Sequence, residues 1–182
     1  MTRRVAAVGS LVFVVGMPGV VAALVPYLIT GGWVGSGAPL ALQLVGGALL
    51  VVGVGVFAHT VIRFVVEGLG TPFPGAPTKN LVVGGLYRYV RNPMYLAVIA
   101  MILGQAAILA SASLLVYAAL FWAIVASFVR FYEEPTLSSK YGEQYAAYRR
   151  AVRSWWPRAT PWRGDDGTRS EASAPSTASA SR

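Results

Sequence analysis

The chain has 182 residues, of which 55% are hydrophobic and only 12% are charged. Soluble domains carry roughly a quarter charged residues, so this composition is typical of a membrane protein. The sequence has no cysteine and one histidine, which excludes disulfides, thiolate nucleophiles and Cys- or His-rich metal sites. The net charge of +8 is better explained by basic residues beside anionic lipid than by nucleic-acid binding.

The charged residues leave two long gaps in the sequence. No Lys, Arg, Asp or Glu occurs between Arg4 and Arg63 or between Arg91 and Arg130. A hydrocarbon core needs about 20 apolar helical residues to cross it, so each gap holds two spans. The sequence therefore predicts an all-α, polytopic membrane protein with about four transmembrane helices.

The first predicted span covers residues 5–25 and follows a basic N-terminus. A cleaved signal peptide is the alternative, because the small residues Ala22 and Ala23 lie near its end. The apolar stretch is longer than the h-region of about 7–15 residues in such peptides, which favours a retained anchor. Pro18 is expected to kink this helix.

The second predicted span covers residues 40–66, and its glycines at positions 46, 47, 53 and 55 suit close helix packing. The third covers residues 93–109, and a tight hairpin at 110–113 leads into a fourth that ends near Tyr132. The loops at 30–39 and 110–113 carry no charge, so all the basic residues fall on one side. This positive-inside pattern predicts that both termini are cytoplasmic.

The composition changes after Trp162, where Ser, Ala and Thr dominate and nothing is apolar enough to pack. We therefore expect a membrane-embedded domain over residues 1–162 and a disordered tail over residues 163–182.

A polar stretch precedes the third span. Asn92 and Pro93 form a helix-start pair, with Asn as the N-cap and Pro at the first helical position. The free amides of such a helix end favour an anionic group. Tyr87, Arg91 and Tyr95 recur every four residues and share one face if the segment is helical. The alternative is a membrane rim, with arginines on lipid phosphates and tyrosines in an aromatic belt.

A second polar group follows the fourth span. Arg130 and Glu134 are four residues apart, so one helical face presents both. A snorkelling arginine with a weak surface ion pair is the simplest interpretation. However, the adjacent carboxylates Glu133 and Glu134 are unexpected beside anionic lipid, and they suit a cationic ligand.

A third group is an aromatic stripe at spacings of four, three and four residues: Tyr141, Tyr145, Tyr148 and Val152. It predicts a C-terminal amphipathic helix. Such a helix commonly lies on the bilayer surface. A second interpretation is that the stripe roofs a pocket built from the other two groups.

The three groups together resemble the isoprenylcysteine carboxyl methyltransferase family and its relatives, the membrane phospholipid N-methyltransferases. The matching residues are Leu81-Val82, the stretch from Gly84 to Tyr95, Arg130 with Glu133-Glu134, and Tyr141 to Tyr148 followed by Val152 and Trp155-Trp156-Pro157. Any one of these motifs alone is weak, but three in order are a specific signal.

The resemblance implies a membrane enzyme that uses S-adenosylmethionine without a Rossmann fold, in a cytosol-facing pocket that a lipid-like acceptor reaches from the bilayer. It implies that Arg130 orients the acceptor. The cofactor-binding residues that it implies are Lys79, Asn80, Leu81, Val82, Tyr87, Asn92, Pro93, Met94, Tyr95 and Glu134. Glu134 would face the cationic part of the cofactor, and the helix end at Asn92-Pro93 would meet its carboxylate.

The chain departs from the family pattern at two places. Prenylcysteine-methylating relatives commonly carry His where Asn92 stands, and the Val-Pro-Arg of the family reads Val152-Arg153-Ser154 here. The acceptor and the atom methylated therefore stay open. A carboxylate on a lipidic or small hydrophobic acceptor is the first hypothesis, and a phospholipid amine is the second.

Two other classes of protein share part of this pattern. A sterol-type NADPH-dependent reductase shares part of the C-terminal pattern, but Met94-Tyr95-Leu96-Ala97 replaces the Asn-Tyr-x-Gly-Glu expected after its proline. A non-enzymatic membrane scaffold accounts for the spans and the charges. It does not account for the clustering of Arg130 with Glu133 and Glu134.

Overall fold

The computed structural model describes residue 16, residues 18–68 and residues 81–164. Every regular element in this part of the chain is helical, which confirms the predicted all-α class. In chain order the elements are η1 (Val20–Leu24), α2 (Val25–Ile29), α3 (Leu40–Gly68), η2 (Gly85–Arg88), α4 (Pro93–Leu109), α5 (Ala112–Phe128), η3 (Val129–Glu133) and α6 (Glu134–Ala151). η1 and η3 are π-helical turns, and η2 is a 3-10 turn.

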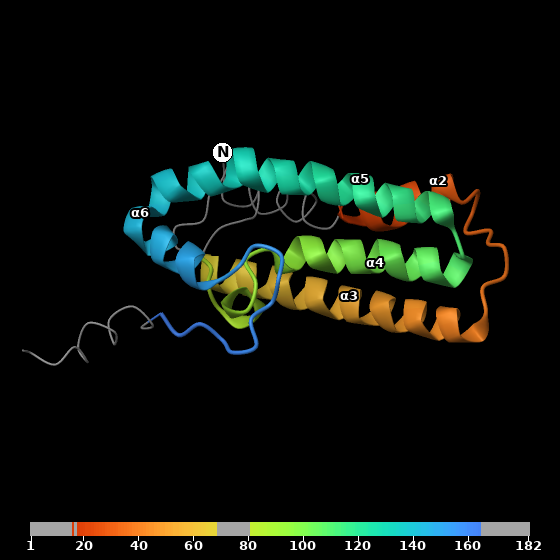
Figure 1. Cartoon of the computed structure of the whole chain (residues 1–182), viewed down its shortest axis with the longest axis horizontal. Helices are drawn as coiled ribbons and strands as arrows, with labels where there is room; N and C mark the ends of the chain where they lie inside the picture. Colours follow the sequence, from red (N-terminus) through yellow and green to blue (C-terminus); the bar gives the residue numbers. More distant parts are fainter. Residues whose placement is uncertain (1–15, 17, 69–80, 165–182) are drawn as a thin grey trace, which may run out of the picture.

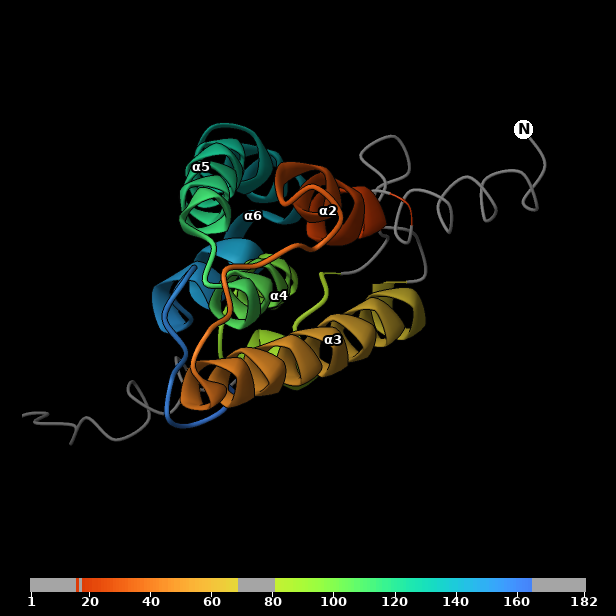
Figure 2. The same cartoon turned by 90° about the vertical axis from the view of Figure 1, so that its right-hand side faces the viewer.

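Helix α4 lies in the middle of the bundle, with α3 on one side and α5 and α2 on the other (Figures 1 and 2). Helices α3, α4 and α5 run in alternating directions, so the two ends of the bundle differ (Figure 1). One end holds the α4–α5 turn and residues 30–39, which carry no charge. The other end gathers the loop before α4, helix α6 and residues 152–164, and it holds the charged side chains described below.

The predicted third span matches α4 at both ends. Ala110 adopts the left-handed conformation with φ 48°, and the Ser111 hydroxyl caps α5 by accepting from the Leu114 amide at 3.4 Å. The hairpin is therefore tighter than the four residues expected. Of the first predicted span, only residue 16 and residues from Pro18 onward are described, and the helix there continues to Ile29 rather than ending at residue 25. The predicted kink at Pro18 depends on earlier residues, which lie outside the described part of the chain. The predicted tail beyond residue 164 also lies outside it.

Two helices are long and apolar enough to cross a membrane: α3 over Leu40–Arg63, and the continuous helical run Ala112–Ala151. Only 11% and 22% of their most apolar windows are buried in the protein. Helix surfaces this apolar and this exposed are suited to contact with lipid. Val20–Ile29 and α4 are shorter apolar helices, and the 17 residues of α4 lie at the lower limit of about 17–25 for a span. The membrane prediction is confirmed, although two rather than four helices meet the length criterion within the described residues.

Each π-helical turn ends two residues before a proline, Pro26 in α2 and Pro135 in α6. A proline inside a helix lacks the N–H that would bond the carbonyl four residues earlier, and its ring clashes with that carbonyl. A wider turn relieves the clash. At Pro26 the carbonyl left over is that of Ala22, and it accepts a hydrogen bond from the buried Gln105 side chain of α4 at 2.7 Å. The proline thereby creates the acceptor that ties η1 to α4.

Helices α3 and α4 touch through their backbones. A Cβ atom built on Gly46 would lie 2.6 Å from the Gly104 carbonyl oxygen, and one built on Gly104 would lie 2.7 Å from the Gly46 oxygen. A Cβ on Gly53 would collide with Met101 at 2.8 Å. Gly47, by contrast, faces open space, as does the glycine at position 55. The sequence prediction of close glycine packing is therefore right for two of the four glycines, those on the α4 side of the helix.

This contact predicts different responses from two adjacent glycines. Replacing Gly46 with Ala should lower the melting temperature of the detergent-solubilised protein, because the new methyl group meets a backbone carbonyl. Overpacking of this kind costs on the order of 1–3 kcal/mol. Gly47→Ala is the matched control and should leave the melting temperature unchanged or raise it, since alanine favours the helix by about 1 kcal/mol. Equal melting temperatures for both variants would contradict the α3–α4 contact.

Candidate active site

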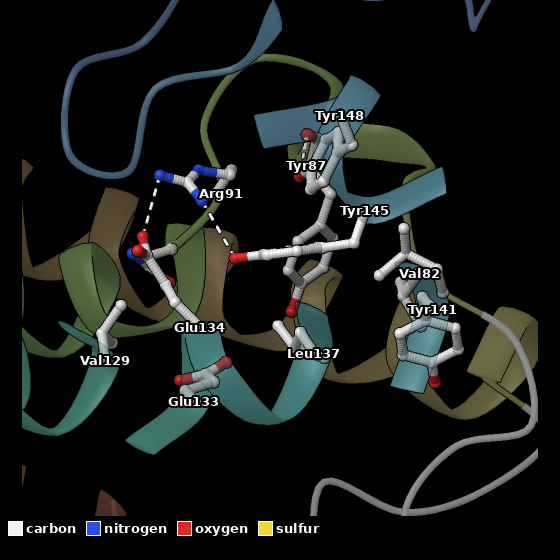
Figure 3. Close-up of a pocket in the computed structure, with 12 residues that line it drawn as sticks. Val82, Tyr87, Arg91, Val129, Glu133, Glu134, Leu137, Tyr141, Tyr145 and Tyr148 are labelled. Atoms are coloured by element: carbon white, nitrogen blue, oxygen red, sulfur yellow. Dashed lines mark hydrogen bonds and ion pairs between the residues drawn. The ribbon is translucent and has the colours of Figure 1, made fainter. Parts of the chain in front are cut away.

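A cavity of about 90 Å³ opens at the charged end of the bundle, between the loop before α4, turn η3 and helix α6 (Figure 3). Twelve residues from these three segments line it: Leu81, Val82, Tyr87, Arg91, Asn92, Val129, Glu133, Glu134, Leu137, Tyr141, Tyr145 and Tyr148. The three polar groups singled out in the sequence therefore meet in space. The aromatic stripe of α6 does form a wall of the cavity, as its second interpretation predicted.

The Glu134 carboxylate is the centre of the polar network. It is buried in the first turn of α6, and Arg91 Nη2 lies 2.9 Å from its Oε1. Arg149 and Arg130 approach Oε2 at 3.3 Å and 3.6 Å, and the Ser154 hydroxyl donates to Oε1 at 3.2 Å. The Arg130–Glu134 pair expected from the four-residue spacing is confirmed. Arg130 is 65% exposed and does not line the cavity, so it stands at the outer edge of the network.

Arg91 is the main site residue that the sequence interpretation missed. The alternative of a membrane-rim role is wrong for Arg91, because its side chain is only 10% exposed. It donates to the Tyr145 hydroxyl at 2.9 Å and also to the Ser154 hydroxyl (Figure 3 shows the bonds to Tyr145 and Glu134). No sequence feature near position 91 predicts these partners, which lie 54 and 63 residues later in the chain.

Asn92 holds the N-cap position of α4 and Pro93 its first helical position, as predicted. The Asn92 side chain nevertheless makes no capping bond. Its Nδ2 is buried without a hydrogen-bond partner, and so is Nε of the neighbouring Arg91. A buried donor without a partner costs about 1–3 kcal/mol, and such groups in a cavity wall are available to a ligand.

The four-residue repeat of Tyr87, Arg91 and Tyr95 does not form one helical face. Tyr87 belongs to η2, Arg91 to the turn that follows, and Tyr95 to α4. Tyr87 and Arg91 line the cavity, whereas the Tyr95 hydroxyl donates to Glu133 Oε2 at 3.3 Å. The Tyr95 ring lies 6.5 Å from that of Trp155, centroid to centroid.

The predicted cofactor residues fall into three sets. Those that line the cavity are Leu81, Val82, Tyr87, Asn92 and Glu134. Pro93, Met94 and Tyr95 begin α4 beside it without being among the lining residues. Lys79 and Asn80 lie outside the described residues.

The two adjacent carboxylates differ in their surroundings. Both follow the apolar part of the helix. The charge of Glu134 is compensated by arginines, whereas Glu133 accepts a hydrogen bond from Tyr95. Burial raises the pKa of the Glu133 carboxyl. The hydrogen bond from Tyr95 and the charge of Arg91 oppose this rise, and the charge of Glu134 adds to it. Glu133 therefore holds a proton more readily than an exposed glutamate does.

Helix α6 packs on the protein rather than presenting its aromatic stripe to the bilayer. Tyr145, Tyr148 and Val152 are all buried, and the Tyr148 hydroxyl donates to the Tyr87 carbonyl at 2.6 Å. Gly142 makes this possible, because its φ of 52° and ψ of −127° bend the helix in a conformation that only glycine adopts easily. The interpretation of α6 as a surface helix is therefore wrong for this face.

Fold and site together define a helical membrane protein with a buried, mixed-charge cavity at one end of its bundle. The family model described as phospholipid methyltransferase matches residues 41–144, more than half of the chain. The chain belongs to this family. It is therefore a membrane methyltransferase, an enzyme class that uses S-adenosylmethionine as methyl donor. No curated protein and no solved structure matches the chain.

Membership in this family distinguishes between the three classes of protein that the sequence suggests. It favours the methyltransferase over the NADPH-dependent reductase and the scaffold. The broader resemblance to isoprenylcysteine carboxyl methyltransferases and phospholipid methyltransferases is confirmed at the level of the family, while the isoprenylcysteine-specific part stays a prediction. Within the described residues no cluster of three or more His, Cys, Asp or Glu side chains is placed to hold a metal ion.

The network predicts unequal roles for two arginines that contact the same carboxylate. Arg91→Ala should lower the free energy of unfolding by about 3–5 kcal/mol, because it leaves the buried Glu134 charge without its nearest partner. Arg149 is 44% exposed, so Arg149→Ala should cost no more than about 1 kcal/mol. Denaturant unfolding of both variants in the same detergent measures the difference, and similar losses would argue against a central role for Arg91.

Proposed function

We propose that the cavity is the cofactor site of this methyltransferase and that it serves a lipid-like acceptor. The proposed cofactor-binding residues are Lys79 to Val82, Tyr87, Asn92 to Tyr95, and Glu134. The proposal rests on one observation: two unpartnered buried donors, Arg91 Nε and Asn92 Nδ2, belong to residues that line the same cavity as Glu134.

The chemistry of these groups fits S-adenosylmethionine, which carries one carboxylate together with an ammonium and a sulfonium. The unpartnered donors and the positive end of the α4 dipole suit the carboxylate. Glu134 suits a cationic group. The apolar and aromatic lining residues, Leu81, Val82 and Tyr141 among them, suit the adenosine.

The cavity has a smaller volume than a site that holds a cofactor. Its volume of about 90 Å³ is below the roughly 300–1,000 Å³ of small-molecule pockets. Side chains must therefore move apart as the cofactor enters. Arg91 is well placed to do so, because a cofactor cation beside Glu134 competes for the carboxylate that Arg91 now contacts at 2.9 Å.

The cofactor supplies an activated methyl group, and the protein orients the two reactants and excludes water from them. Methyl transfer requires an in-line approach of the acceptor to the methyl carbon, so orientation and exclusion of water account for much of the rate. We assign the orientation of the acceptor to Arg130, whose exposed guanidinium stands 3.6 Å from Glu134 at the edge of the network.

A carboxylate is the first candidate acceptor, because the free face of Arg130 is suited to pair with it and a carboxylate needs no general base. A phospholipid amine is the second candidate, favoured by the family description. An amine must lose a proton, and Glu133, whose pKa burial raises, is a suitable proton acceptor at the cavity wall.

The charge pattern supports a cytoplasmic site. The segments that carry the basic residues from Arg88 onward lie at the end of the bundle that holds the cavity (Figure 1). The segments at the other end carry no charge in the described part of the chain. Basic residues are retained on the cytoplasmic side of membranes. We therefore propose a multi-pass protein with the cavity and both termini in the cytoplasm.

Asn92→Ala separates cofactor binding from folding. The side-chain nitrogen Nδ2 of Asn92 has no hydrogen-bond partner within the protein, so removal of this side chain should leave the melting temperature of the cofactor-free protein nearly unchanged. The same change should raise the dissociation constant of S-adenosylmethionine about tenfold, because a hydrogen bond to a charged ligand group is lost. Isothermal titration of the purified protein measures this constant, with Glu134→Gln as a second variant expected to weaken binding. Unchanged affinity in both variants would refute the site.

Arg130→Ala tests the acceptor. Cells that express the wild-type protein should contain a lipid species heavier by one CH₂ group than in cells without it, as seen by mass spectrometry of lipid extracts. Arg130→Ala should lose this species while keeping its affinity for S-adenosylmethionine. The chemical position of the added methyl group, on oxygen or on nitrogen, separates the two acceptor classes. A variant that methylates as well as wild type would remove Arg130 from the proposed role.

A further inference from the structure

The segment that follows α6 turns back over the loop in front of α4. We call residues 152–162 the return segment. Its backbone is hydrogen-bonded to residues 88–92: the Arg91 and Asn92 amides donate to the carbonyls of Arg153 and Ser154 at 2.9 and 3.3 Å. Farther along, the amides of Arg158 and Trp162 donate to carbonyls of that loop at 2.9 and 3.0 Å. The loop that carries the two unpartnered donors is therefore held by the C-terminal part of the chain.

The return segment is anchored at both ends by buried side chains. Val152 is fully buried, and Trp162 is 9% exposed with its ring 5.2 Å from that of Tyr148. Arg88 adds a side-chain bond, donating from Nε to the Trp162 carbonyl at 2.6 Å. Anchors on either side fix the residues between them, and Ser154 is one of these.

The Ser154 hydroxyl lies between the two opposite charges of the cavity. It accepts a hydrogen bond from Arg91 Nη2 and donates to Glu134 Oε1 at 3.2 Å. The Tyr145 hydroxyl accepts from Nη1 of the same guanidinium at 2.9 Å. With both terminal nitrogens held in this way, the orientation of the guanidinium is set, and with it the position of the unpartnered Nε.

We propose that Ser154 is a positioning residue of the cofactor site and that the return segment belongs to the active unit. The match to the family model ends at residue 144, so that match does not include Ser154. The inference rests on the proposed function, because it assigns Ser154 to the pocket proposed for S-adenosylmethionine. Ser154 acts through Arg91 and Glu134, which are the groups proposed to face the cofactor.

The sharpest test compares serine variants of the full chain in detergent or in lipid nanodiscs. Ser154→Ala should raise the dissociation constant of S-adenosylmethionine about tenfold, because the hydroxyl bridges two charged groups. Ser154→Thr keeps the hydroxyl and should restore affinity to within about threefold of wild type. Ser138→Ala, on the exposed face of α6, is the matched control and should bind as wild type does.

A purely structural role for Ser154 gives a different pattern. Ser154→Ala would then lower the melting temperature but leave the affinity of the remaining folded protein unchanged, and this outcome would overturn the proposal. Failure of threonine to rescue binding would overturn it as well. If the wild type itself does not bind S-adenosylmethionine, the proposed function falls and the role of Ser154 falls with it. Wild-type binding with an unaffected Ser154→Ala variant rejects only the present inference.

Hydrogen exchange tests the return segment without any cofactor. The Arg91 and Asn92 amides should exchange slowly in the wild type, because both are bonded to the return segment. Trp162→Ala removes one anchor and should accelerate exchange in peptides that cover residues 84–92, while peptides from the middle of α4 keep their wild-type rate. Equal exchange of the loop in both proteins would show that the return segment does not hold it.

Discussion

The polar end of this molecule depends on one buried carboxylate, that of Glu134. A charge taken out of water is costly unless it is paired and hydrogen-bonded. Here the compensation comes from Arg91 at 2.9 Å, from the Ser154 hydroxyl and from two more exposed arginines. These partners belong to the loop before α4, to the continuous helix of η3 and α6, and to the C-terminal segment. A single charge therefore holds together three separate parts of the chain.

Helix geometry determines how that carboxylate reaches the cavity. The sequence Glu133-Glu134-Pro135 places a proline directly after the pair, and the helix responds with the π-helical turn η3. Two neighbouring carboxylates then have different surroundings. Glu134 meets arginines, while Glu133 contacts the Tyr95 hydroxyl at 3.3 Å. The two acids therefore differ in chemistry through their different contacts.

Much of the architecture followed from local patterns. The boundaries of α4 were predicted at both ends, because a proline start and a small-residue turn act over a few residues. The Arg130–Glu134 pair and the tyrosine stripe were also predicted, since helical spacing alone places them. The glycines of α3 show the limit of such reasoning: their sequence predicted close packing, but only contact with α4 separates Gly46 from Gly47.

The sequence by itself determined the helical membrane class, the charged end of the bundle and most residues around the cavity, because hydropathy and helical period are properties of short stretches. Only the tertiary structure decided the roles of Arg91 and Ser154. Their pairing with each other and with Glu134 joins residues 20 to 63 positions apart, and no local pattern encodes that distance. Burial made the difference: an arginine that reads as a lipid-facing rim residue becomes a cavity residue once α6 and the return segment fold over it.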